Sequence, residues 1–191
     1  MAGPVRFLSP QEHAVLEAAC ERCIPATDAH PGARALGVAD YIDGLLGAFL
    51  VDPPRIWAGG PFSGRHGGEP GFDTYLRLSS LEELAWRTRI EGSQGIPERE
   101  RLGPVKGWQQ EYRDGIAALG ADYCDCDGEE QDRRLDALPG FKALCYEHAC
   151  EGAYGAPEYG GNRGGAGWRA IGFPGDVAPR GYTDAEVSER P

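Results

Sequence analysis

The sequence lacks a long hydrophobic run. Its most apolar segment, residues 41–51, is interrupted by Asp43, Gly44 and Gly47, whereas a membrane-spanning helix needs roughly 20 apolar residues in succession. We therefore expect a soluble chain that does not insert directly into a membrane. The first ten residues contain no basic start, no apolar stretch and no paired arginines. We accordingly expect a cytoplasmic location; the alternative is a periplasmic one, reached on a partner's signal or after removal of a leader.

Positive charge is also scarce. The chain has 19 Lys and Arg against 30 Asp and Glu, a net charge of −11, while nucleic acids and anionic membranes select basic patches. Nucleic acid is therefore not an expected partner. Acidic residues are densest over residues 122–136, where Asp122, Asp125 and Asp127 resemble calcium ligands without the spacing of an EF-hand loop. A solvated acidic surface is the favoured interpretation of this stretch, and calcium binding is the weaker one.

Strand patterns are absent, since no segment alternates apolar and polar residues. Helical signals are present instead. Ser9, Pro10 and Glu12 form a capping box, and the helix that follows should end before Ile24. Residues 38–49 repeat apolar side chains at three- and four-residue steps, as one face of a helix does.

Further helices are expected after a second capping box at Ser80–Glu83 and over residues 108–119, 129–138 and 140–150. The predicted fold class is all-α, an irregular bundle of five to seven helices with long Gly/Pro-rich loops and an extended C-terminal arm. We expect one domain overall, in which residues 1–150 form the helical body. Residues 151–191 would form a docking arm, rich in glycine and aromatic residues, and a polar tail.

What the sequence has in excess is glycine, with 29 residues beside 15 prolines. These residues concentrate in 58–71 and 152–175, and we expect loops over 26–34 and 57–73. The glycine-rich segment, residues 151–175, is not a phosphate-binding loop, because it follows a predicted helix and lacks a Gly-Lys-Ser/Thr sequence.

Four large aromatic residues interrupt the glycines of this segment. Glycine lets another backbone approach closely, and aromatic side chains supply the anchors that protein interfaces use. The polar pair Asn162–Arg163 would be costly to hold in a loop without partners. The segment therefore reads as an extended arm that lies on another protein. Its aromatic residues are Tyr154, Tyr159, Trp168 and Phe173.

Six cysteines raise the question of metal binding. They form three close pairs, Cys20 with Cys23, Cys124 with Cys126, and Cys145 with Cys150. Structural thiols are the favoured interpretation, but a disulfide within or between chains and a metal site stay open.

Histidine is scarce, and no two of the four histidines have the spacing of metal ligands. Only His148 lies on a predicted buried helix face next to the glycine-rich segment. A hydrogen-bonded histidine that fixes the following loop is favoured over a catalytic one.

The C-terminal pattern resembles a known family. Tyr159–Arg163 reads YGGNR and is followed by Gly167–Trp168 and by Ile171–Gly175, which reads IGFPG. This signature, together with His148 and Glu151 upstream, resembles that of the gluconate 2-dehydrogenase subunit 3 family. The N-terminal part, from Phe7 through Ile24–Pro25 and Pro31–Ala33 to Leu46, fits the same pattern.

The resemblance implies a small (gamma) subunit with no catalytic, cofactor-binding or metal-binding residue of its own. The partner would be a large FAD-binding catalytic subunit of the glucose–methanol–choline type that oxidises a sugar, glycoside, sugar acid or polyol. A cytochrome c subunit is a possible third chain. The small subunit would stabilise or mature the flavoprotein; the alternative is a self-contained metal- or thiol-dependent enzyme or metal-binding protein. The expected partner interface comprises His148, Glu151, Tyr154, Tyr159, Gly160, Gly161, Asn162, Arg163, Trp168 and Phe173.

Overall fold

The computed structural model describes residues 6–58 and 75–175. Within these ranges the chain forms α-helices, short 3₁₀ turns and no strand, which confirms the all-α prediction. The α-helices are α1 (Pro10–Cys23), α2 (Gly32–Leu36), α3 (Val38–Leu46), α4 (Ser80–Glu91), α5 (Trp108–Leu119), α6 (Gly128–Asp136), α7 (Pro139–Tyr154) and α8 (Ala166–Ala170). In the described part of the chain, none of these helices has the length and hydrophobicity to cross a membrane.

Most of the expected loop at residues 57–73, and all of the polar tail at 176–191, lie outside the described residues. The predictions for these two segments are therefore not tested.

The first capping box is confirmed and the second is shifted by one residue. The Ser9 hydroxyl accepts a hydrogen bond from the Glu12 N–H, and the Glu12 carboxylate accepts one from the Ser9 N–H. Helix α4 is capped in the same way by Ser79 and Glu82, not by Ser80 and Glu83. Two serines and two glutamates in succession allow either register, so the local sequence does not decide between them.

Two helices occur where no helix was expected, which raises the number in the described residues to eight. Helix α2 lies at the end of the predicted loop 26–34, and α8 lies inside the glycine-rich segment. Each has five residues, too few for a periodic pattern to be recognised in the sequence.

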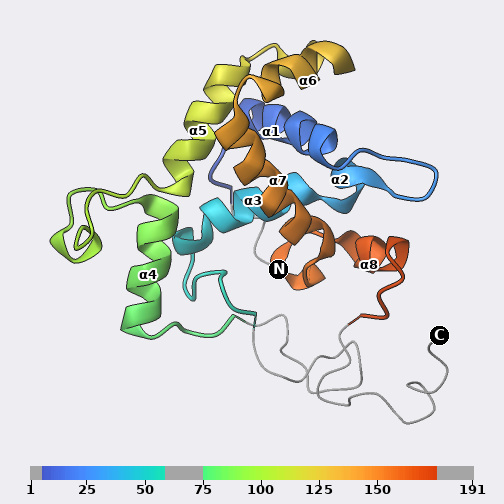
Figure 1. The fold of residues 1–191 in the computed structure, drawn as a ribbon. Coiled ribbons are helices and arrows are strands. Elements are labelled where there is room, and N and C mark those ends of the chain that lie inside the picture. The colour runs from blue at the N-terminus through green and yellow to red at the C-terminus, as the bar shows by residue number, and fades with distance from the viewer. Residues whose placement is uncertain (1–5, 59–74, 176–191) are drawn as a thin grey trace, which may run out of the picture.

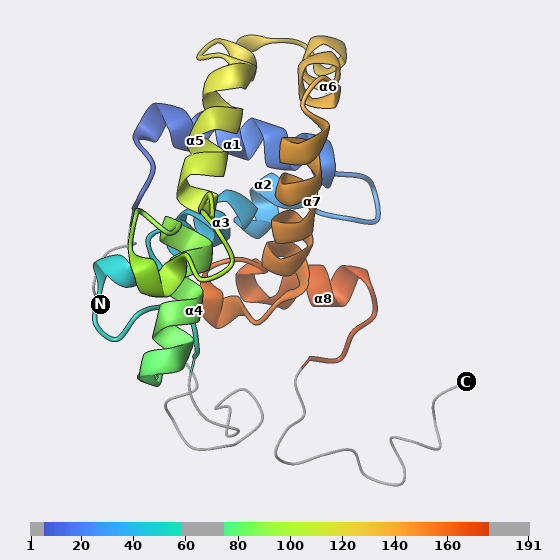
Figure 2. The same ribbon diagram turned by 60° about the vertical axis from the view of Figure 1, so that its left-hand side comes forward.

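The core lies where α1, α3, α5 and α7 meet. Helix α7 runs across α1, α2 and α3, from α6 at one end to α8 at the other (Figures 1 and 2). The apolar positions expected to face inward on α1, α3 and α5 are mostly buried. Buried core side chains include Val15, Leu16, Ala19, Val38, Ile42, Leu46, Tyr112, Ile116, Leu119, Cys145 and Ala149.

The glycine-rich segment is not an extended arm over its described residues. Helix α7 continues to Tyr154 and so crosses the expected boundary at residue 150. The following residues form two 3₁₀ turns, Pro157–Tyr159 and Arg163–Gly165, and then α8, which contacts α7. The expected arm is therefore part of the helical body up to Gly175, because its buried polar groups find partners within the chain.

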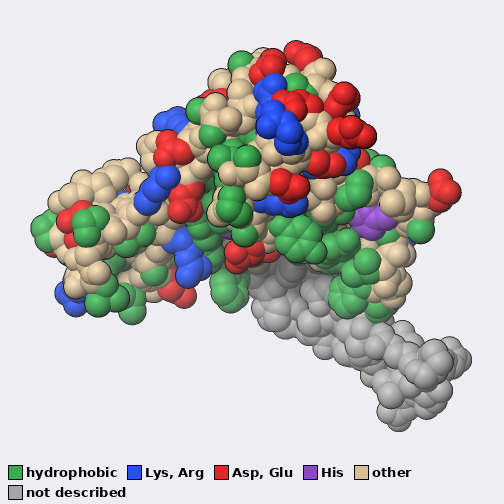
Figure 3. Space-filling model, turned by 45° about the horizontal axis from the view of Figure 1, so that its top comes forward, with side chains coloured by type: hydrophobic (Ala, Val, Ile, Leu, Met, Phe, Trp, Pro, Cys, Tyr) green, Lys and Arg blue, Asp and Glu red, His purple; other side chains and the backbone are tan. Residues whose placement is uncertain are grey.

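The acidic residues at 122–136 have structural partners. Asp122 pairs with Arg134 at 2.9 Å, Asp132 pairs with Arg22 at 2.6 Å, and the Asp127 carboxylate caps α6 by accepting the Glu130 N–H at 2.9 Å. Figure 3 shows acidic side chains interspersed with basic ones over the face it presents. These contacts give Asp122, Asp127 and Asp132 structural roles within the fold.

Candidate functional site

Asn162 organises the glycine-rich segment. Its side chain is fully buried; the amide donates to the Gly155 carbonyl at 2.8 Å, and its oxygen accepts the Gly167 N–H at 2.9 Å. Its φ of 43° is left-handed, a conformation that asparagine tolerates better than most residues. A side chain at the preceding Gly161 would collide with the Gly152 carbonyl on α7. The glycine in this motif therefore permits close contact with the chain's own helix.

Arg163 fastens the segment to α3. Its guanidinium donates to the Asp40 carboxylate and lies directly over Gly37. Gly37 has a φ of 72°, and a side chain there would overlap Arg163. Asp40 also contacts His13 at 3.0 Å and Arg6 at 3.6 Å. The Asp40 carboxylate thus connects α1, the segment before α1 and the Tyr159–Arg163 motif.

Two tyrosines extend this contact toward α7. The Tyr41 hydroxyl donates to the Glu151 carboxylate at 2.8 Å, and burial together with the Glu151 charge raises the pKa of Tyr41. The Tyr159 hydroxyl accepts a hydrogen bond from the Ala58 N–H at 3.0 Å. The first bond joins α3 to α7, and the second joins the motif to residue 58.

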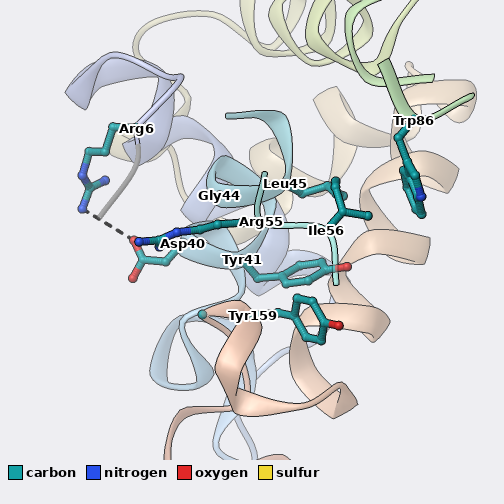
Figure 4. Close-up of a pocket in the computed structure, with 10 residues that line it drawn as sticks. Arg6, Asp40, Tyr41, Gly44, Leu45, Arg55, Ile56, Trp86 and Tyr159 are labelled. Atoms are coloured by element: carbon teal, nitrogen blue, oxygen red, sulfur yellow. Dashed lines mark ion pairs between the residues drawn. The ribbon is translucent and has the colours of Figure 1, made fainter. Parts of the chain in front are cut away.

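A cleft of about 340 Å³ opens beside these rings. Figure 4 shows Tyr41 and Tyr159 lying near each other, with Arg6 and Asp40 at one end of the cleft and Trp86 at the other. Its walls are mainly apolar, and its charged groups lie at one end. Such a cleft suits an apolar or aromatic group that carries a polar end. The lining is completed by Gly44, Leu45, Arg55, Ile56 and Gly160.

A second apolar surface surrounds α8. Trp168 donates its indole N–H to the Tyr154 carbonyl, and its ring meets that of Phe173 edge-on at 5.4 Å. Phe173 is 42% exposed and Ile171 is 56% exposed. Phe173 and Pro174 border a groove of about 410 Å³ beside Trp168, and Ile171 lies outside its lining. We call Trp168, Ile171, Phe173 and Pro174 the α8 surface.

His148 is buried in the core and is 1% exposed. Its Nδ1 hydrogen-bonds the Tyr112 hydroxyl at 3.0 Å, and Trp108 packs edge-on against its ring at 4.5 Å. Burial lowers the pKa of His148 to about 4, so the ring is neutral at pH 7. His148 is hydrogen-bonded, as expected. Its bond to Tyr112 joins α7 to α5, however, and does not hold the glycine-rich segment that follows α7. Glu151 is exposed, and its carboxylate accepts a hydrogen bond from Tyr41, whereas His148 is bonded to Tyr112.

The expected partner interface is thus divided between the core and the surface. His148, Gly161 and Asn162 are buried within the chain and serve its own fold. They are therefore not available as contacts for another protein, contrary to the expectation. For the others, contact with a partner stays a prediction. They are half-buried or exposed: Glu151, Tyr154, Tyr159, Gly160, Arg163, Trp168 and Phe173.

The cysteines are arranged differently from the pairs seen in the sequence. All six lie in described residues and are unbridged. Cys20 and Cys23 of α1 meet Cys145 of α7, whose near neighbour in the sequence is Cys150. In the parts of the chain that the structure covers, no three or more His, Cys, Asp or Glu side chains form a group able to hold a metal ion.

Comparison with known proteins gives one match. The family model described as gluconate 2-dehydrogenase subunit 3 matches residues 10–175 of this chain. No curated protein and no solved structure shows significant similarity to it. The matched region runs from the first residue of α1 to the end of the α8 surface and includes every residue of the motif built around Asn162. This chain therefore belongs to the gluconate 2-dehydrogenase subunit 3 family.

Proposed function

We propose that this chain is the non-catalytic small subunit of an oxidoreductase complex whose large subunit is an FAD-binding flavoprotein of the glucose–methanol–choline type. The large subunit would oxidise a CH–OH group of a sugar, glycoside, sugar acid or polyol and would hold the only flavin of the pair. A cytochrome c subunit could accept the electrons. The small subunit would bind the flavoprotein and stabilise or mature it.

The family match carries this proposal, and the α8 surface supports it. The exposed Phe173 packs edge-on against the partly buried Trp168, and Ile171, also exposed, follows α8 directly in the chain. The Trp168 indole N–H is already bonded to Tyr154. An aromatic ring held by such a bond can anchor a partner without losing further freedom.

The titratable groups support a binding role more than a catalytic one. His148 is buried and engaged with Tyr112, and Asp40 is bonded to three cationic or imidazole side chains. The Glu151 carboxylate accepts a hydrogen bond from Tyr41. Each of these three groups has a partner within the fold, as the proposal of a binding subunit expects.

The test is co-expression of this chain, affinity-tagged, with a flavin-binding chain of the glucose–methanol–choline type from the same genome. We expect the two to co-purify, the complex to carry flavin absorbance and to reduce a dye with a sugar or polyol, and the small chain alone to be colourless and inactive. Addition of a cytochrome c chain to the co-expression, with haem absorbance of the purified complex as the measurement, would test the third subunit. Flavin binding or dye reduction by the small chain alone, or failure of the two chains to associate, would overturn the proposal.

A further inference from the structure

Three thiols lie together in the core at the contact between α1 and α7. The Sγ atoms of Cys20 and Cys145 are 3.8 Å apart, and Cys23 interacts with Cys145 from the next turn of α1. Cys20 and Cys23 share one helix face because they are three residues apart. Cys145 is thus the common neighbour of two thiols that lie more than 120 positions away in sequence.

Access to the three thiols differs. Cys20 and Cys145 are 1% and 0% exposed, whereas Cys23 is half-buried at the end of α1. A small oxidant therefore meets Cys23 first. Its interaction with Cys145 and its burial raise the pKa of Cys23, while the nearby Lys142 acts in the opposite direction. The thiol form dominates at neutral pH, and the rate of oxidation should increase with pH because the thiolate is the nucleophile.

We propose that Cys145 is the central thiol of a peroxide-sensitive site that forms a disulfide between α1 and α7. The two sulfur atoms, 3.8 Å apart, must approach to about 2.05 Å to form the bond. The disulfide would close a loop of more than 100 residues and constrain the unfolded chain. It would fix α7, which carries the family motif at its C-terminal end, to α1.

The chemistry balances with hydrogen peroxide as the oxidant. The Cys23 thiolate attacks one peroxide oxygen, the O–O bond breaks, and a sulfenic acid and hydroxide form. The Cys145 thiol then attacks the sulfenic sulfur and releases water, giving a Cys23–Cys145 disulfide. Exchange with the Cys20 thiol transfers the bond to Cys20–Cys145 and returns Cys23 as a thiol. Two thiols lose two hydrogen atoms in total, and one peroxide is reduced to two molecules of water.

The test treats the full reduced chain with hydrogen peroxide, blocks remaining thiols by alkylation, and maps disulfides by mass spectrometry without reduction. We expect a linked peptide pair joining Cys145 to Cys20, preceded in time by one joining Cys145 to Cys23. The oxidised chain should unfold at a temperature about 10 °C higher than the reduced chain, and a dithiol reductant should reverse the shift.

Variants separate this site from the other cysteines. Cys145→Ala should form neither linked peptide pair. Cys23→Ser should form the disulfide at a much lower rate. The control Cys126→Ser should change neither the linked pairs nor the rate of disulfide formation. The mapping of the unmodified chain requires no variant, so a failure of Cys145→Ala to fold leaves the test intact. Oxidation confined to Cys124, Cys126 or Cys150, or a linked pair that lacks Cys145, would overturn the proposal.

Discussion

At the scale of single residues, polar groups enclosed by the fold hold this molecule in its shape. Asn162 bridges two backbone segments, and Asp43, which is 1% exposed, accepts the N–H groups of Phe7 and Leu8 at 2.9 and 2.8 Å. Removal of such a group leaves its partners buried without a hydrogen bond, which costs more than the bond itself contributes. The largest effects of substitution are therefore expected at these positions.

Replacement of Asn162 by glycine tests this expectation. Glycine adopts the φ of 43° without strain, so the variant removes the hydrogen bonds to Gly155 and Gly167 without straining the backbone, and it adds only the entropy of a more flexible unfolded chain. We expect the free energy of unfolding to fall by about 1–3 kcal/mol, measured by urea denaturation. Asn162→Ala should cost more because it adds backbone strain. An unfolding midpoint for Asn162→Gly equal to that of the parent would contradict this account.

His148 makes the stability depend on pH. Its pKa is about 4 in the folded chain, below the ordinary value of 6.5, so between these values the unfolded chain binds more protons than the folded one. Stability should therefore decrease as pH falls from 6.5 to about 4, by up to about 3 kcal/mol. Urea denaturation across this range measures the slope. His148→Gln, which does not titrate, should show a smaller slope than the parent, and an equal slope would rule out the histidine as its source.

At the scale of elements, the ends of the helices are set by local hydrogen bonds, and α4 shows how fine the choice is. Ser79 and Ser80 are adjacent and both exposed, yet only Ser79 accepts the Glu82 N–H. We expect Ser79→Ala to lower the free energy of unfolding by about 1 kcal/mol and Ser80→Ala to leave it nearly unchanged. Thermal unfolding of the two variants distinguishes the registers. A larger loss of stability for Ser80→Ala than for Ser79→Ala would show that Ser80 is the N-cap of α4.

At the scale of the whole molecule, the apolar surface left exposed is where a second chain can bind. Phe173→Asp should weaken co-purification with the flavin-binding chain at least tenfold, because the charge disrupts a hydrophobic contact worth about 2 kcal/mol. The matched control is Leu102→Asp, since Leu102 is fully exposed in the loop between α4 and α5, on the other side of the molecule from α8 (Figure 1). Titration of the complex by light scattering or calorimetry measures both. Equal losses for the two variants would argue against the α8 surface as the docking site.

Each helix longer than five residues was predictable from the sequence, because caps, prolines and apolar periodicity are local. The Ser9 box begins α1, Pro139 begins α7, and the apolar stripe of α3 is buried as predicted. The helices α2 and α8 were not predictable, since five residues carry no period and both depend on contacts with the rest of the chain.

The sequence by itself determined the helical class and the family motif, because both depend on residues that are close together along the chain. Only the tertiary structure decided which motif residues face outward. It buried Asn162 and Gly161 against α7, left Phe173 at the surface, and brought Cys145 of α7 to Cys20 of α1. The physical reason is that burial and long-range hydrogen bonds arise only when helices distant in sequence pack together. The local sequence around an asparagine therefore does not show whether its side chain will be buried or exposed.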